Sequence, residues 1–195
     1  MAYTGIEADE VTYTQEDMGG NLPQMPFFKD KKGTMHEDTI KIMEFLAKTY
    51  KPDLMPQNED QKINFDMIVN YLQALNTYLC EYCYGKQQDT SLTDGIYEKM
   101  SPIVGYIKGQ NNSFLLSNQV SFIDFYMYEC TELLDFLTEG QVYTNYPELY
   151  NHSSSMAASL QPFWDKMHAS TAYPFFHRFT QINNWPEVNF KNKHQ

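Results

Sequence analysis

The chain has 195 residues, of which 42% are hydrophobic, and its 25 acidic and 14 basic side chains give a formal net charge of −11 at pH 7. This length and apolar content indicate a folded protein with a real core and exclude an intrinsically disordered chain. The negative charge would repel a nucleic-acid backbone or an anionic membrane surface, so we expect neither as a partner.

The beginning of the chain and its cysteines bear on the cellular compartment. The N-terminal stretch contains Glu7, Asp9 and Glu10 and lacks both the apolar run of a secretory signal and the arginines of a transit peptide. No stretch approaches the ~20 consecutive apolar residues of a membrane span. Three cysteines cannot form a closed set of disulfides, which fits a reducing compartment. We expect an intracellular protein, cytoplasmic by default.

Short strands are predicted in the first part of the chain. Residues 6–13 alternate loosely between apolar and polar and are followed by the breaking pair Gly19-Gly20. Residues 25–28 and 34–35 predict a second and a third strand, joined by a lysine-rich turn that ends at Gly33. After Asp38 the apolar residues recur with a helical period until Pro52, so a helix is predicted there.

The remainder is predicted to be helical. Pro52 and Pro56 mark a linker, and we place a domain boundary there, with domains at residues 1–51 and 52–195. A long helix ending near Gly85 is predicted to carry its apolar residues on one face, namely Ile63, Met67, Tyr71, Leu75 and Leu79. A shorter helix around residues 96–107 is predicted to be interrupted by Pro102. Two more helices are predicted at 122–137 and 147–167, before an irregular aromatic stretch at 173–195.

A specific local pattern opens the helix at residue 122. Ser121 and Asp124 have the spacing of a capping box, in which each side chain satisfies a backbone amide of the other residue. Val120 and Phe125 supply the hydrophobic staple that accompanies such a box. The pattern predicts a well-defined N-terminus for a helix that is apolar on most sides.

This capped helix resembles the core helix of the C-terminal domain of glutathione transferases. Segments 114–116 and 145–149 are similar in order and spacing to the mu class of that family, and the resemblance covers most of residues 40–170. It implies an α+β fold, in which a truncated thioredoxin-like N-terminal domain precedes an all-α helical domain. The family's fold does not by itself imply its reaction.

The resemblance also implies a glutathione site. Gln24-Met25-Pro26 looks like the family's cis-proline segment, and Asp38-Thr39 lies where the family holds the γ-glutamyl carboxylate at a helix N-terminus. It therefore names Met25, Pro26, Asp38 and Thr39 as candidate contacts for glutathione, as ligand or substrate.

Other parts of the family's site are missing or altered. Residues 3–7 resemble the end of the family's first helix, so this sequence lacks the first strand and most of the first helix, together with the catalytic hydroxyl. We assign no catalytic residue, although replacement by Tyr3 or Tyr13 stays an alternative. Ala74 lies where the family's neighbouring subunit would contribute an acidic group. Two sheet edges left by the missing strand would favour pairing with another chain.

Cysteines and histidines could in principle form a redox site, a metal site or a ligand contact. Cys80-x-x-Cys83 has the spacing of a redox pair or half a zinc site, but its place late in a helix favours packing thiols. The five histidines show no metal-ligand spacing, so we expect no metal site. His177-Arg178 in the aromatic tail is a further candidate ligand contact, because the family's C-terminal segment covers the substrate site.

These observations lead to three functional expectations. The first is a catalytically degenerate glutathione-transferase-like subunit that docks in a larger protein assembly, as a hetero-oligomer or a dimer. The alternative is an active glutathione transferase that conjugates glutathione to electrophiles. The third, glutathione binding without turnover, lies between them.

Overall fold

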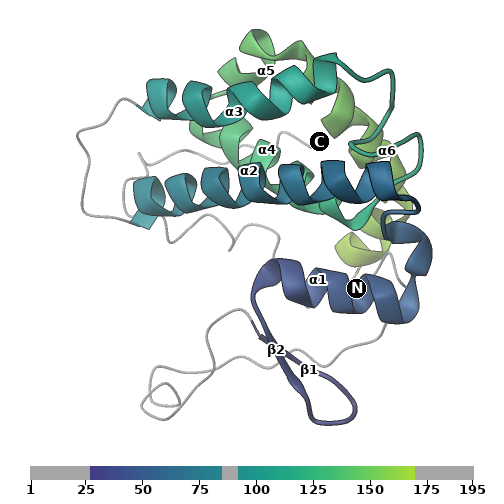
Figure 1. The fold of residues 1–195 in the computed structure, drawn as a ribbon. Helices are drawn as coiled ribbons and strands as arrows, with labels where there is room; N and C mark the ends of the chain where they lie inside the picture. The colour runs from purple at the N-terminus through teal and green to yellow at the C-terminus, as the bar shows by residue number, and fades with distance from the viewer. Residues whose placement is uncertain (1–26, 85–91, 170–195) are drawn as a thin grey trace.

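A computed structural model describes residues 27–84 and 92–169 of the chain. Two antiparallel strands come first, β1 (Phe27–Lys29) and β2 (Met35–Glu37), with Phe28 opposite His36. The elements that follow are α1 (Thr39–Tyr50), the 3-10 turn η3 (Pro52–Leu54), α2 (Glu59–Tyr84), α3 (Leu92–Lys108), α4 (Phe122–Leu137), α5 (Gln141–Asn145) and α6 (Pro147–Ala169). The predicted α+β class is confirmed, with the small sheet at one end and the helices forming the rest (Figure 1).

The hairpin is built around the side chain of Asp30. Its Oδ1 accepts hydrogen bonds from the Lys32 and Thr34 amides at 2.9 Å each, and Gly33 takes the positive φ of 86° that the turn requires. The predicted strand, lysine-rich turn and strand are therefore confirmed, with ends shifted by one or two residues. The predicted strand at residues 6–13 lies outside the described residues.

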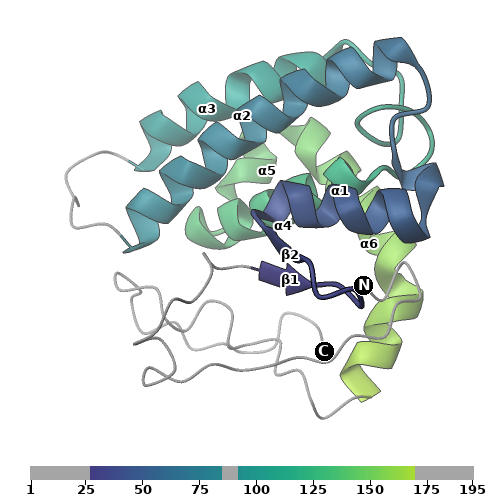
Figure 2. The ribbon, with the colours of Figure 1, turned by 60° about the horizontal axis from the view of Figure 1, so that its bottom comes forward.

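Helix α1 joins the hairpin to the helical part. It contacts both strands on one side and α4 on the other, as Figure 2 also shows. Of the predicted apolar face, Ile40, Leu46 and Ala47 are buried and Met43 is partly buried, whereas the prediction is wrong for Tyr50, which is 39% exposed. Pro52 starts η3, which places Leu54 in the core with 4% of its surface exposed. The domain boundary drawn at this point stays a prediction.

The core lies where α2 packs against α3 and α4. On α2, a stripe of Ile68, Leu72, Leu75 and Leu79 is fully buried. The prediction that Ile63 shares this face is wrong, because Ile63 is 67% exposed. An α-helix has 3.6 residues per turn, so a series of apolar residues spaced by four drifts around the helix axis. Over the sixteen residues from Leu79 back to Ile63 this drift is about 160°, which places Ile63 on nearly the opposite face from Leu79.

The predicted interruption at Pro102 is also wrong. Helix α3 continues through this residue from Leu92 to Lys108. Proline removes one helical hydrogen bond, to the carbonyl four residues earlier at Glu98. Both Glu98 and Pro102 are exposed, so water can satisfy that carbonyl, while Met100 and Ile103 are fully buried and hold the helix in place.

The C-terminal half is organised around α4. Eight of its sixteen residues are buried, and it contacts α1, α2, α5 and α6. The short helix α5 was not predicted, because five residues are too few to show a helical period. In the described residues, no helix is both long and apolar enough to cross a lipid bilayer.

Candidate functional site

Two of the four predicted glutathione contacts lie at the beginning of α1. Asp38 is the N-cap residue of this helix and is exposed, and Thr39 is its first residue and is half-buried. Met25 and Pro26 lie outside the described residues. The candidate site therefore starts from the N-terminus of α1, where unpaired backbone amides can attract an anion.

Asp38 already binds those amides with its own side chain. Its Oδ1 accepts hydrogen bonds from Ile40 N at 3.0 Å and Lys41 N at 3.1 Å. The residue has φ 73° and ψ 127°, outside the left-handed helical region and in a sparsely populated conformation for a residue with a side chain. The sequence pattern of an aspartate just before an apolar helical run would have predicted this cap. The Asp38 carboxylate thus already accepts hydrogen bonds from two of the backbone amides at this helix end.

The hairpin holds the start of α1 through an aromatic contact. The His36 ring from β2 stacks on Phe45 of α1, with centroids 3.9 Å apart, and Phe28 packs at 6.0 Å from Phe45. His36 Nε2 also lies 3.4 Å from Asp30 Oδ2. Partial desolvation acts to raise the pKa of Asp30, but hydrogen bonds from Thr34, His36 and Lys32 outweigh it and lower that pKa. Asp30 therefore serves to stabilise the hairpin turn through these hydrogen bonds.

Tyr126 of α4 lies within electrostatic reach of Asp38. It is 8% exposed. Burial raises its pKa above the ordinary tyrosine value, and the charges of Cys130, Cys80 and Asp38 raise it further. A tyrosine that activates a thiol needs the opposite shift, toward an easier loss of its proton. Tyr126 is thus poorly suited to activate a thiol. Tyr3 and Tyr13, the tyrosines considered from the sequence as replacements for a catalytic hydroxyl, lie outside the described residues.

Cys80 and Cys130, the two cysteines whose side chains the structure describes, do not form an activated thiol site. Burial, with a contribution from Cys80, raises the pKa of Cys130 to about 12. Burial and Glu81 raise the pKa of Cys80 as well, so both thiols stay protonated near neutral pH. The prediction that Cys80 is a packing thiol is wrong, because Cys80 is exposed, whereas Cys130, which was not part of that prediction, is buried. The side chain of Cys83 lies outside the described residues.

The most extensively bonded polar group is the buried carboxylate of Asp124. The predicted capping box is present, with Asp124 Oδ2 accepting from Ser121 N at 2.8 Å and from Ser121 Oγ at 2.6 Å. Asp124 Oδ1 accepts from Leu115 N at 2.8 Å and lies 2.9 Å from His152 Nε2 of α6. Because Asp124 is fully buried, this cluster is a structural anchor and is closed to ligands.

Metal ligands do not gather in the described residues. No group of three or more His, Cys, Asp or Glu side chains there is arranged to hold an ion. His36 stacks on Phe45, and His152 belongs to the Asp124 cluster. The expectation of no metal site stays a prediction. His177-Arg178 lies outside the described residues.

Comparison with known proteins identifies the fold. No protein-family model matches the sequence, and no curated protein matches it either. Among solved structures, a major glutathione S-transferase specific to the nematode C. elegans aligns with a TM-score of 0.67 and 19% identity, covering 88% of this chain and 89% of that one. A diazinon-metabolizing glutathione S-transferase of the silkworm Bombyx mori aligns with a TM-score of 0.63 and 15% identity, covering 75% and 71%.

These similarities show that the chain has the fold of glutathione S-transferases. The resemblance drawn from the capping box is confirmed at this level. At such low identity the likeness shows the fold alone and carries no activity with it. The mu-class assignment stays a prediction.

Proposed function

We propose that this chain is a catalytically degenerate protein with the glutathione-transferase fold that serves as a docking subunit in a protein assembly. The observation that supports it most directly is the cap of α1 by Asp38, whose carboxylate binds Ile40 N and Lys41 N. A glutathione carboxylate at this helix end would have to displace a tethered carboxylate of the same charge. Like charges at one site disfavour each other, so the site selects against the ligand.

Activation of a thiol is disfavoured as well. Tyr126, the tyrosine within reach of Asp38, has a raised pKa, and so do the thiols of Cys80 and Cys130. A low thiol pKa needs nearby positive charge or strong hydrogen-bond donors. These three groups therefore favour binding roles over conjugation chemistry.

The outward face of α2 is the surface we propose for docking. Ile63 projects from it with 67% of its surface exposed. Glu59, Asp66 and Asn70, at −4, +3 and +7 from Ile63, are exposed on the same face. Glu59 is paired with the exposed Lys62, so Asp66 is the unbalanced charge among these neighbours of Ile63. An apolar centre beside a carboxylate, on a chain of net charge −11, fits a protein partner with an apolar pocket and a basic side chain beside it.

An active glutathione transferase is the second candidate. It is favoured by the fold shared with two glutathione S-transferases, one of which metabolises diazinon according to its description. In this alternative, Met25, Asp38 and Thr39 would contact glutathione and an electrophile would be conjugated to its thiol. Glutathione binding without turnover is an intermediate case.

Calorimetric titration of glutathione separates these functions. We expect no binding heat at millimolar glutathione and no conjugation of an electrophile above the uncatalysed rate. Asp38→Asn is the matched variant, because asparagine keeps the cap and tolerates a positive φ while removing the charge. We expect this variant to be folded and to show no binding heat either, since its side-chain oxygen still accepts the hydrogen bonds of both amides. One-to-one binding by the unmodified chain, lost in Asp38→Ala, would establish the enzyme or sensor alternative instead.

Docking is tested by the size of the complex that the chain forms in extracts of its source cells. We expect a tagged chain to sediment as part of a larger assembly, and Ile63→Asp to shift it toward the monomer. Tyr150→Asp is the matched control, because Tyr150 is also apolar and 57% exposed but lies on α6. Higher salt should weaken the complex, since the Asp66 carboxylate beside Ile63 contributes to it. A chain that stays monomeric, or an Ile63→Asp variant that assembles normally, would refute this surface.

A further inference from the structure

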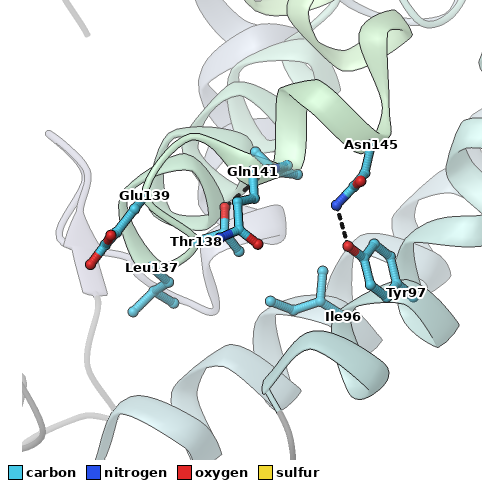
Figure 3. Close-up of a pocket in the computed structure, with 8 residues that line it drawn as sticks. Ile96, Tyr97, Leu137, Thr138, Glu139, Gln141 and Asn145 are labelled. Carbon is cyan, nitrogen blue, oxygen red and sulfur yellow. Dashed lines mark hydrogen bonds between the residues drawn. The ribbon is translucent and has the colours of Figure 1, made fainter.

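A pocket of about 310 Å³ lies between α3, the end of α4 and α5. Its lining residues are Ile96, Tyr97, Leu137, Thr138, Glu139, Gln141, Val142 and Asn145 (Figure 3). This volume falls at the lower end of the range for small-molecule sites, which is roughly 300–1,000 Å³. In Figure 1, α5 lies at the top of the molecule and the hairpin at the bottom, so the pocket is separate from the Asp38 site.

The floor of the pocket is apolar and fixed. Ile96 and Val142 are each only 2% exposed and belong to the hydrophobic core, and Leu137 packs against that core. Ile96 and Val142 are therefore almost completely covered by the core, and the partly exposed Leu137 is the apolar side chain that a ligand can reach. A ligand that covers it needs an apolar body.

Hydrogen-bonding groups lie on one wall. Asn145 Nδ2 donates to the Tyr97 hydroxyl, which links α5 to α3, and the Tyr97 ring packs edge-on against Tyr146 at 5.6 Å. The Tyr97 hydroxyl proton and Asn145 Oδ1 are thereby oriented and have capacity for another bond. The Gln141 amide points into the space between Leu137 and Ile96 (Figure 3). Thr138 is already used, since its Oγ1 donates to Leu134 O and accepts from Val142 N.

The lining of the pocket carries a negative charge. Glu139 is the charged residue among the eight, and it forms no ion pair within the described residues. Its φ is 51°, a left-handed conformation that costs a side-chain-bearing residue of order 1 kcal/mol or more. The helix end accounts for this conformation, because Glu139 N donates to Phe136 O and Gly140 N to Asp135 O, the pattern of a left-handed C-cap that ends α4. The Glu139 carboxylate is exposed. A lining with a carboxylate and no basic side chain excludes anions and favours cations.

We propose that this pocket binds a small organic cation with an apolar body about the size of one aromatic ring and a single ammonium group. The ring packs on Leu137, the ammonium pairs with Glu139, and a further polar group of the ligand meets Gln141 or Asn145. The site is distinct from the glutathione-type site and from the docking face of α2, so it stands whether or not the proposed docking role holds.

Three probes of one skeleton test the assignment on the full chain. 2-Phenylethylamine, 2-phenylethanol and 3-phenylpropanoate carry the same ring with a positive, neutral and negative end. We expect amide shifts in nuclear magnetic resonance spectra to be confined to α3, the end of α4 and α5, with affinity falling in that order. Binding of the anion as tightly as the amine, no binding of the amine at 10 mM, or shifts elsewhere would each overturn the proposal.

Two variants separate the charge from the cavity. Glu139→Gln should weaken the amine about two- to fivefold, the value of an exposed ion pair, and leave the alcohol unchanged. Gln141→Trp, at an exposed position, should fill the space and abolish binding of both. Glu59→Gln removes an equally exposed charge from α2 and should change neither. Equal weakening of the amine by Glu139→Gln and Glu59→Gln would show general charge attraction and overturn the site.

Discussion

Asp124→Ala is expected to lower the free energy of unfolding by about 3–5 kcal/mol, the cost of breaking a buried, hydrogen-bonded charge cluster. The carboxylate is fully buried and bonds Leu115 N, Ser121 N, Ser121 Oγ and His152. Its removal leaves two backbone amides and a buried imidazole without their acceptor. The free energy of unfolding of a typical protein is roughly 5–15 kcal/mol, so this loss would remove a large share of the stability.

Urea unfolding followed by circular dichroism measures this effect. The midpoint should fall strongly in Asp124→Ala, and Ser121→Ala should lose only about 1 kcal/mol, because it removes the hydroxyl and leaves the amides paired. Asp66→Ala, an exposed aspartate on α2, should stay within about 0.5 kcal/mol of the unmodified chain. An Asp124→Ala midpoint close to that of Asp66→Ala would show that the cluster contributes little to stability.

Two glycines of α3 should respond to alanine with opposite signs. A Cβ at Gly95 would collide with the hydroxyl and ring of Tyr78 from α2, so Gly95→Ala must displace the Tyr78 ring or move the two packed helices apart. We expect a loss of about 1–3 kcal/mol, typical of overpacking. At Gly105 a Cβ would meet nothing within 4 Å, and Gly105→Ala should gain about 0.5–1 kcal/mol from better helix propensity.

The same unfolding experiment compares both glycine variants, and each serves as the control for the other. The double variant Gly95→Ala with Tyr78→Ala tests the cause, because removing the ring removes the collision. In the Tyr78→Ala background, Gly95→Ala should therefore be neutral or stabilising. If Gly95→Ala costs the same with and without the Tyr78 ring, close helix packing at this point is not its reason.

The sequence predicted the elements whose signals are local. The capping box of Ser121 and Asp124 was found because both residues lie within one helical turn. The hairpin and α1 were found from turn residues and period. Errors occurred where a local rule met tertiary packing: Pro102 lies inside a continuous helix, since buried neighbours hold α3 together, and Ile63 lies on the outward face of α2.

For the candidate site, sequence alone determined less. It named Asp38 and Thr39 by resemblance, and the structure places both at the start of α1 but uses Asp38 as the helix cap. The pocket of Tyr97, Glu139, Gln141 and Asn145 gave no sequence signal, because its walls are brought together from α3 and α5, 48 residues apart at the Tyr97–Asn145 hydrogen bond.

The sequence by itself determined the α+β class, the capped core helix and the resemblance to glutathione transferases, because periodicity and caps depend on neighbours within a few residues. Only the tertiary structure decided that Leu115 and His152 complete the Asp124 cluster, from 9 and 28 residues away. It also decided which apolar side chains are exposed and where a pocket forms. These depend on which helix faces meet, and that follows from the packing of the whole chain rather than from local sequence.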